Sequence, residues 1–399
     1  MKQAQIPEYA FDLFSDEGIL HPYAHYKAVR DLGPIVYLPA QDCYAVSRYA
    51  DIRRVLADSD TFISGKGVSL NEEMNATLTA SIITSDPPHH DFIRKIELEP
   101  VSPKALGELR ETIFSSASGL LAELKMSDGA FDAVERIACY LPLSVVMELG
   151  GLPPVGREKM LEWAAAVFDL QGPMNARGRA SLPALQALFD YVSEGIDRDS
   201  ITSGSWADRA FRLADEGVVP PDMVKYLLID FIAPSLDTTI AATANLLMLL
   251  GQNPDQWRLL KADPRKIPNA INESLRVETP IRCFSRYVSR DAEIDGVAIA
   301  QGARIAVFYA SANRDERRWE DADRFDIGRR GAEQQFAFGH GRHSCVGANL
   351  ARLEMTAIMQ AMLNDVESFE IGQPEFAVNN LLRALKRLPI KLTMSEETE

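Results

Sequence analysis

The pattern of apolar and polar positions predicts a mainly helical chain. Ser102 followed by Pro103 is typical of a helix start, and we expect that helix to reach about Lys125. Pro268 opens a second helix that extends through Glu278. Helical signals dominate most of the sequence, so the helices should form most of the fold.

Strand signals are few and short. β-favouring residues flank a polar turn within residues 33–48, which predicts a hairpin, and the pair Asp295-Gly296 marks a second hairpin turn. The expected fold class is therefore mainly α with small β-sheets.

One long apolar stretch, residues 226–250, belongs either in a membrane or in the core. It carries Asp230 and Asp237 near its centre. Each carboxylate would cost about 2.5 to 3.5 kcal/mol on insertion into a bilayer. We therefore expect a buried helix and no membrane association.

Composition and charge narrow the class of protein. The 399 residues would by length alone suggest two or more domains. A net charge of -15 argues against a broad nucleic-acid surface. The N-terminus has no apolar run after a basic segment, and the four cysteines lie far apart without a C-x-x-C pair. We expect a cytoplasmic protein without disulfides.

The segment 338–347 carries the strongest chemical signal. It is a glycine-dense loop that runs into an apolar-periodic helix, and Cys345 stands at the helix start. The helix dipole and free N–H groups there favour a thiolate, which is a metal ligand. Gly339, Gly341 and Gly347 let the backbone approach a flat cofactor.

Two other interpretations of this loop remain open at this point. Cys345 could be a buried structural cysteine, or it could share a zinc ion with His340 and His343. The zinc site would need a fourth ligand that the sequence does not identify.

The loop resembles the cysteine-ligand signature of the cytochrome P450 superfamily, Phe-x-x-Gly-x-His-x-Cys-x-Gly, at every fixed position from Phe338 to Gly347. The resemblance implies haem b, iron protoporphyrin IX, with Cys345 as its iron ligand and Phe338, Gly339 and Gly347 beside it. It spans essentially the whole chain and implies one triangular P450 domain over residues 1–399, with a flexible acidic tail at 394–399.

A second match concerns fold integrity. Glu273 and Arg276 resemble the family's Glu-x-x-Arg pair, and one helical turn puts both side chains on one face. Arg324 would complete this structural triad. The resemblance implies that the triad locks the segment carrying the cysteine loop.

Further matches concern the haem propionates, which need cationic or hydrogen-bonding partners in a partly buried site. By resemblance these partners are His90, Arg94, Arg286 and His343. The alternative for each is an ordinary surface charge.

The resemblance also implies a proton relay for oxygen activation, formed by the acid-alcohol pair Asp237 and Thr238. Thr238 would hydrogen-bond the bound oxygen, and Asp237 would pass protons inward. Pro234 and Ser235 depart from the family pattern. Pro234 should kink the helix, and Ser235 can bond back into it.

The implied activity is insertion of one oxygen atom of O2 into a small organic substrate. Electrons would come from an acidic ferredoxin-type partner, steered to a basic patch of Arg94, Lys95, Arg342 and Arg352, and we expect a monomer. The alternatives are a peroxide-using haem enzyme, against which Asp237-Thr238 counts, and a non-catalytic binding scaffold, against which Cys345 counts.

For the substrate, the chain is similar to bacterial enzymes that hydroxylate or O-demethylate small aromatic compounds. Thr77 and Ala80, which match carboxylate-binding positions, are not cationic, and Asp230 would repel a carboxylate. We expect a neutral or cationic aromatic, with Asp230 accepting a donor from it, unless Asp230 pairs with an internal arginine or a backbone group. The other expected pocket contacts are Phe168, Gln171 and Phe231.

Overall fold

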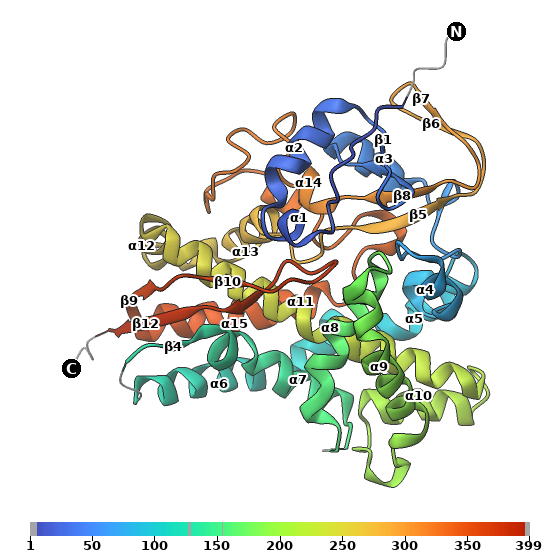
Figure 1. Cartoon of the computed structure of the whole chain (residues 1–399). Coiled ribbons are helices and arrows are strands. Elements are labelled where there is room, and N and C mark those ends of the chain that lie inside the picture. Colours follow the sequence, from blue (N-terminus) through green and yellow to red (C-terminus); the bar gives the residue numbers. More distant parts are fainter. Residues whose placement is uncertain (1–5, 127–128, 154, 396–399) are drawn as a thin grey trace.

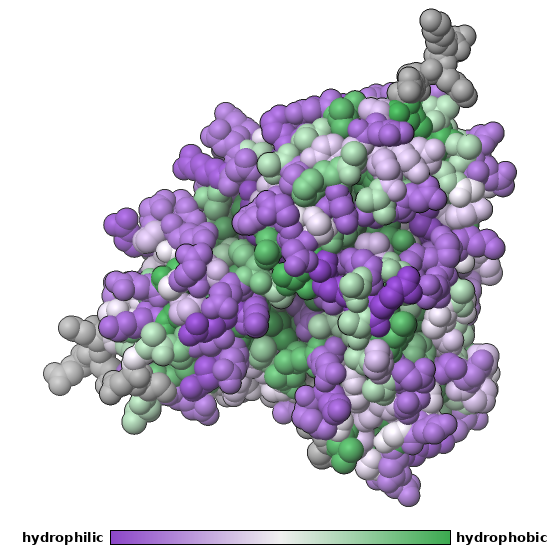
Figure 2. Space-filling view, viewed as in Figure 1, coloured by the Kyte–Doolittle hydropathy of each residue, from purple (hydrophilic) through white to green (hydrophobic). Residues whose placement is uncertain are grey.

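The computed structural model describes residues 6–126, 129–153 and 155–395. Within them the chain is mainly helical, as expected, and has a broadly triangular outline (Figure 2). The helices are α1 (Asp16–Leu20), α2 (Pro22–Leu32), α3 (Tyr49–Ala57), α4 (Glu72–Thr77), α5 (His89–Leu98), α6 (Pro103–Lys125), α7 (Tyr140–Gly150), α8 (Met160–Gln171), α9 (Ala176–Asp190), α10 (Trp206–Asp215), α11 (Val224–Gln252), α12 (Pro254–Ala262), α13 (Ile267–Val277), α14 (Tyr309–Ala312) and α15 (Ala348–Asp365).

The strands form small sheets at the edges of the helical body (Figure 1). They are β1 (Val36–Leu38), β2 (Cys43–Val46), β3 (Phe62–Ile63), β4 (Phe131–Asp132), β5 (Phe284–Val288), β6 (Ala292–Ile294), β7 (Val297–Ile299), β8 (Arg304–Val307), β9 (Val366–Ile371), β10 (Glu375–Phe376), β11 (Leu385–Arg387) and β12 (Pro389–Met394). The largest sheet has the order β1-β2-β8-β5-β3, with β2 and β8 parallel. The others are β4-β12-β9, β6-β7 and β10-β11.

Local sequence signals determine several of these elements. The Ser102 hydroxyl accepts from the N–H of Ala105, so it caps α6 as predicted. The first hairpin is β1-β2. The second is β6-β7, whose turn residues Asp295 and Gly296 both have positive φ, 47° and 79°. Such a turn matches the twist of the paired strands.

The apolar helix α11 runs through the centre of the molecule and packs on α7, α8, α13 and α15. The combined helical segment Pro221–Gln252 is long and apolar enough to cross a membrane, but 72% of its most apolar part is buried inside the protein. This agrees with the expected core helix.

Two hydrophobic clusters stabilise the fold. The larger joins α6, α7, α8, α11, α13 and α15, and the smaller lies between the five-stranded sheet and helices α2, α3 and α14.

Of the expected acidic tail, Met394 ends β12 and the N–H of Ser395 donates to the carbonyl of Asp365 at 2.8 Å. Residues 396–399 lie outside the described residues.

Candidate active site

The cysteine loop turns tightly before α15 and presents Cys345. Gly339 and Gly341 have φ of 69° and 71°, a left-handed backbone that side chains disfavour. A Cβ atom on Gly341 would lie 2.6 Å from the carbonyl oxygen of Leu56. The N–H of Cys345 donates to the carbonyl of Phe338 at 2.8 Å and closes the loop. Glycine is therefore required for the turn.

Cys345 has a free, accessible side chain in a desolvated setting. Burial raises the pKa of the thiol, while hydrogen bonds from the N–H groups of Gly347 and Ala348 and the charges of Arg94 and Arg352 act in the opposite direction. A group that is desolvated and yet accessible borders internal space. The sulfur can therefore reach a bonding partner there, and its donors favour a thiolate.

The geometry does not support the zinc alternative. Over the described residues, no group of three or more His, Cys, Asp or Glu side chains lies close enough to hold a metal ion. His340 packs edge-on against Phe336, with ring centroids 6.1 Å apart, and His343 packs against His90. The histidines of this loop therefore do not converge on Cys345.

The four residues expected at the propionates gather beside the cysteine loop. The rings of His90, on α5, and His343 lie 4.3 Å apart between centroids. Arg94, one turn after His90, donates to the Ser344 hydroxyl at 3.1 Å. Arg286, on β5, is buried and acts electrostatically on His343. Three segments far apart in sequence thus form one cluster.

This cluster is rich in donors and fits an anionic ligand. Burial, followed by the charges of Arg286, His90, Arg94 and Arg342, lowers the pKa of His343 to about 2, so its ring is neutral. The Nε2 atoms of His90 and His343 are buried, and neither has a hydrogen-bond partner in the described part of the chain. Buried nitrogens without protein partners indicate a ligand. The residues present therefore fit the carboxylates of haem.

The middle of α11 borders internal space. Pro234 is exposed and Thr238 is half-buried, although the helix runs through the molecular centre. Figure 2 shows an apolar hollow on this face, near α8 and α11 of Figure 1. The Thr238 hydroxyl donates to the carbonyl of Pro234 at 2.7 Å, and the Ser235 hydroxyl donates to that of Phe231 at 2.5 Å. Ser235 thus bonds back into the helix, and the kink at Pro234 stays a prediction.

The carboxylate of Asp237 has different surroundings from the hydroxyl of its neighbour Thr238. No cation or hydrogen-bond donor of the described residues pairs with its carboxylate, and burial raises its pKa to about 7. Its charge contributes, after burial, to the raised pKa of Cys139, so the two side chains are close. Asp237 is half-buried and can exchange a proton near neutral pH.

The structure corrects the expected role of Asp230. Oδ1 accepts from the Ser81 hydroxyl, and Oδ2 accepts from the N–H of Ile82 at 2.8 Å. Glu97 also hydrogen-bonds the same carboxylate. The alternative, in which Asp230 pairs within the protein, is the one observed. Ser81 lies 149 residues away in sequence, so local pattern could not show this contact.

The other expected substrate contacts have partners within the protein. Phe168 is buried in the smaller hydrophobic cluster. Phe231 packs against Trp206 at the start of α10, with ring centroids 5.9 Å apart. The backbone carbonyl of Gln171 accepts from the N–H of Leu70, and its buried side-chain oxygen has no partner among the described residues. Phe168 and Phe231 thus make packing contacts within the protein, and their contact with a substrate stays a prediction.

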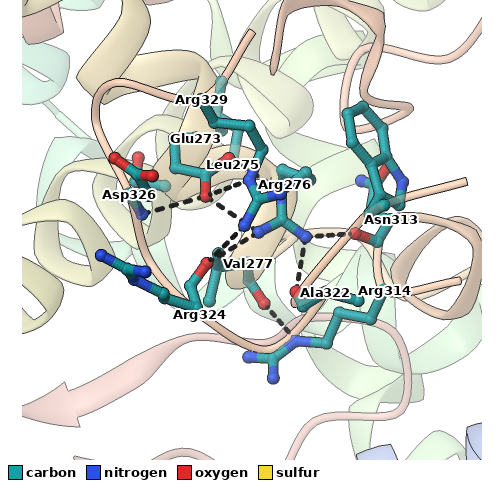
Figure 3. A network of polar contacts seen from close by, with 12 residues as sticks. Glu273, Leu275, Arg276, Val277, Asn313, Arg314, Ala322, Arg324, Asp326 and Arg329 are labelled. Atoms are coloured by element: carbon teal, nitrogen blue, oxygen red, sulfur yellow. Dashed lines mark hydrogen bonds and ion pairs between the residues drawn. The ribbon is translucent and has the colours of Figure 1, made fainter. Parts of the chain in front are cut away.

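Figure 3 shows the network around Glu273 and Arg276. Arg276 donates to both oxygens of Glu273 at 2.7 and 2.9 Å and to the carbonyl of Asn313 at 2.8 Å, and neither charged side chain has exposed surface. Arg324 contributes only its carbonyl, and its guanidinium points away. The second cation on Glu273 is Arg329, at 2.8 Å. Arg329 therefore takes the place predicted for Arg324, and no periodic signal marks it.

Most of the predicted basic patch is engaged in internal contacts. Arg342 donates to both oxygens of Asp91 at 2.6 and 2.8 Å. Arg94 turns toward the cysteine loop, and Arg352 lies over an aromatic ring of that loop at 4.3 Å. Lys95 is exposed and has no ion pair in the described part of the chain. The patch is thus weaker than the sequence suggests.

Comparisons with known proteins agree with this site. Residues 267–394, which include the cysteine loop, match the family model of cytochrome P450. Cytochrome P450 CYP199A2 of Rhodopseudomonas palustris is 34% identical over 98% of this chain and 95% of its own, and vitamin D(3) 25-hydroxylase of Pseudonocardia autotrophica is 31% identical over 96% of each. CYP268A2 of Mycobacterium marinum, solved with pseudoionone, is 26% identical with a TM-score of 0.85 over 97% of this chain and 99% of its own. The chain therefore belongs to the cytochrome P450 family of haem-dependent monooxygenases.

Proposed function

We propose that Cys345 is the protein ligand of the haem iron. The observation that carries this proposal is an accessible free thiol just before α15, with the N–H groups of Gly347 and Ala348 directed at it. A haem held by Cys345 would supply the chemistry that cleaves the O–O bond of O2, because a thiolate ligand donates electron density to iron. The protein must therefore keep Cys345 ionised and shielded.

His90, Arg94, Arg286 and His343 bind the haem propionates in this proposal. The two arginines supply charge, and the two histidines supply Nε2 atoms that have no hydrogen-bond partner among the described residues. Charge-assisted hydrogen bonds of this kind are shorter and stronger than neutral ones. The cluster would fix the orientation of the haem relative to Cys345.

Thr238 and Asp237 form a path for proton transfer in this proposal. The Thr238 hydrogen is engaged by the carbonyl of Pro234, so the hydroxyl oxygen keeps its lone pairs free to accept a hydrogen bond. Asp237 is half-buried, unpaired within the described residues and has a pKa near 7, so it can take protons from solvent. A bound water can complete the path between the two side chains.

The proposed substrate is a small neutral or cationic aromatic that is hydroxylated or O-demethylated. The ionised Asp230, one helical turn before Pro234, disfavours an anion near this side of α11.

Matched titrations of the haem spin state with benzoate, anisole and benzylamine test the substrate class. We expect anisole or benzylamine to shift the spin state at concentrations at least tenfold below benzoate. Tight binding of benzoate by the wild-type protein would contradict the charge argument.

The proposed electron donor is an acidic ferredoxin in the cytoplasm that docks on α5, where Lys95 is exposed. Lys95→Glu should slow electron transfer from a recombinant acidic [2Fe–2S] ferredoxin more than Arg342→Glu, because Asp91 already neutralises Arg342. The difference should shrink as salt screens the encounter. Lys391→Glu, on β12, is the control. Equal rates for Lys95→Glu and this control at low salt would exclude docking at α5.

A further inference from the structure

Two carboxyl groups outside the haem site meet between α5, α11 and the short 3-10 helix η1 (Ile82–Thr84). Glu97 on α5 and Asp230 on α11 are joined by a side-chain hydrogen bond. Glu97 is only 7% exposed. The charged groups that act on Glu97 are Asp230 and Arg94. Asp230 accepts hydrogen bonds from Glu97, from the Ser81 hydroxyl and from the N–H of Ile82.

The hydrogen bonds show where the pair carries its proton. Asp230 accepts from Ser81, from Ile82 and from Glu97, so it is the ionised member. A hydrogen bond between two carboxyl groups requires a proton, and Glu97 supplies it. The Oε1 atom of Glu97 is buried and has no partner among the described residues. An ionised oxygen there would be far more costly than the carbonyl oxygen of a neutral acid.

Asp230 connects this pair to the active site. Both of its contacts outside α5 are at the start of η1, so it fixes that segment against α11. Asp230, Pro234 and Thr238 follow one another at intervals of four residues, which places them along one side of the helix. The start of η1 is therefore held beside the internal space that Pro234 and Thr238 border.

We propose that Glu97 and Asp230 form a proton-sharing latch, in which these positioning residues hold η1 beside the active site until Glu97 loses its proton. Two adjacent carboxylates in a desolvated setting repel each other, and a shift of Asp230 away from Glu97 would displace the start of η1 that is bonded to it. The inference does not depend on the identity of the substrate or of the electron donor.

The direction of the pH effect follows from the environment. Burial, and then the charge of Asp230, raises the pKa of Glu97 well above its usual range, while Arg94 acts against the rise. A raised pKa means that the stabilisation is complete below the usual glutamate pKa and is lost as pH rises toward the raised value. Burial also raises the pKa of Asp230, to about 6, so Asp230 is ionised from neutral pH upward. The latch is thus closed near neutral pH and opens in alkali.

Hydrogen exchange of residues 79–86 in the haem-loaded protein, without substrate, tests this latch. Glu97→Gln keeps a neutral donor, so wild type and variant should exchange alike at pH 7, above the pKa of about 6 of Asp230, whereas wild type should exchange several-fold faster at pH 9. Comparison at the same pH cancels the intrinsic pH dependence of exchange. Glu97→Ala, which lacks the donor, should exchange faster than Glu97→Gln at both pH values.

Two further variants keep the test decisive. Asp230→Asn should raise exchange at both pH values without the alkaline increment, because no second charge remains. Glu354→Gln, in α15, is the matched control: burial raises the pKa of this distant glutamate to about 8, and its loss should leave η1 exchange as in wild type. The same alkaline increment in wild type, Glu97→Gln and Asp230→Asn would overturn the latch.

Discussion

Asp230 and Asp237 lie seven positions apart on α11 and have different surroundings. Asp230 is fully bonded: the Ser81 hydroxyl, the N–H of Ile82 and Glu97 all donate to it. Asp237 has no such partner among the described residues, and burial alone raises its pKa to about 7. The first carboxylate holds structure, and the second remains free to move a proton.

The difference shows that burial does not assign a role to a carboxylate, because both side chains are desolvated. The available donors decide the role. Burial raises the pKa of Asp230 to about 6, and the hydrogen bonds from Ser81, Ile82 and Glu97 act against the rise. Asp237 has no such donors, so its pKa lies closer to neutral pH and the group is suited to general acid chemistry. Substitution of Asp237 should therefore change turnover, whereas substitution of Asp230 should change mainly the free energy of unfolding.

The largest effect is expected from Asp237→Asn. Removal of the titrating group should lower the rate of product formation about 100-fold, the lower range for loss of a general acid. Steady-state turnover with a saturating electron donor measures this. Turnover within about twofold of wild type would show that Asp237 does not transfer protons. Neither aspartate would then have a role in the chemistry.

Thr238→Ala should have the next largest effect. The variant should still oxidise NADH through the donor chain but yield about tenfold less product, with peroxide formed instead, because the proton path loses the hydrogen-bond acceptor that the Thr238 hydroxyl provides. NADH consumed, peroxide and product are measured together. Full coupling would show that the Thr238–Pro234 hydrogen bond has no part in oxygen activation.

The pH profile should show a somewhat smaller change. With a pKa of about 7, the protonated fraction of Asp237 falls nearly tenfold from pH 6 to pH 8. Product formed per NADH should fall over the same interval and should be flat in Asp237→Asn. A profile that is unchanged by this substitution would place the titrating group elsewhere.

Asp230→Asn should have the smallest effect on chemistry. Turnover should stay within about threefold of wild type, while the free energy of unfolding should fall by about 1 to 3 kcal/mol because buried donors lose their charged acceptor. Thermal unfolding beside turnover separates the two outcomes. A turnover loss as large as that of Asp237→Asn, with normal stability, would contradict the structural role of Asp230.

Local signals were sufficient for much of the fold. The Ser102 cap predicted the start of α6, and the turn pair Asp295-Gly296 predicted the hairpin β6-β7, because each depends on neighbours in sequence. The cysteine loop is likewise a local motif. Its predicted position just before a helix is what the structure shows for Cys345 and α15.

The contacts that the sequence did not reveal depend on partners far away in the chain. Arg329 rather than Arg324 pairs with Glu273, 56 residues earlier, because the connecting segment has no regular period that would orient its side chains. Phe231 faces Trp206, and Arg342 is neutralised by Asp91, 251 residues before it. Charge and hydrophobicity alone do not reveal such pairings.

The most direct test of the account is the visible spectrum of the purified protein, reduced and bound to CO, for wild type and Cys345→Ser. If Cys345 is the iron ligand, wild type shows the strongly red-shifted Soret band of thiolate ligation, and the variant loses it. Haem content, measured on the same samples, shows whether the variant still holds haem. A wild-type spectrum that is preserved in Cys345→Ser would contradict the account.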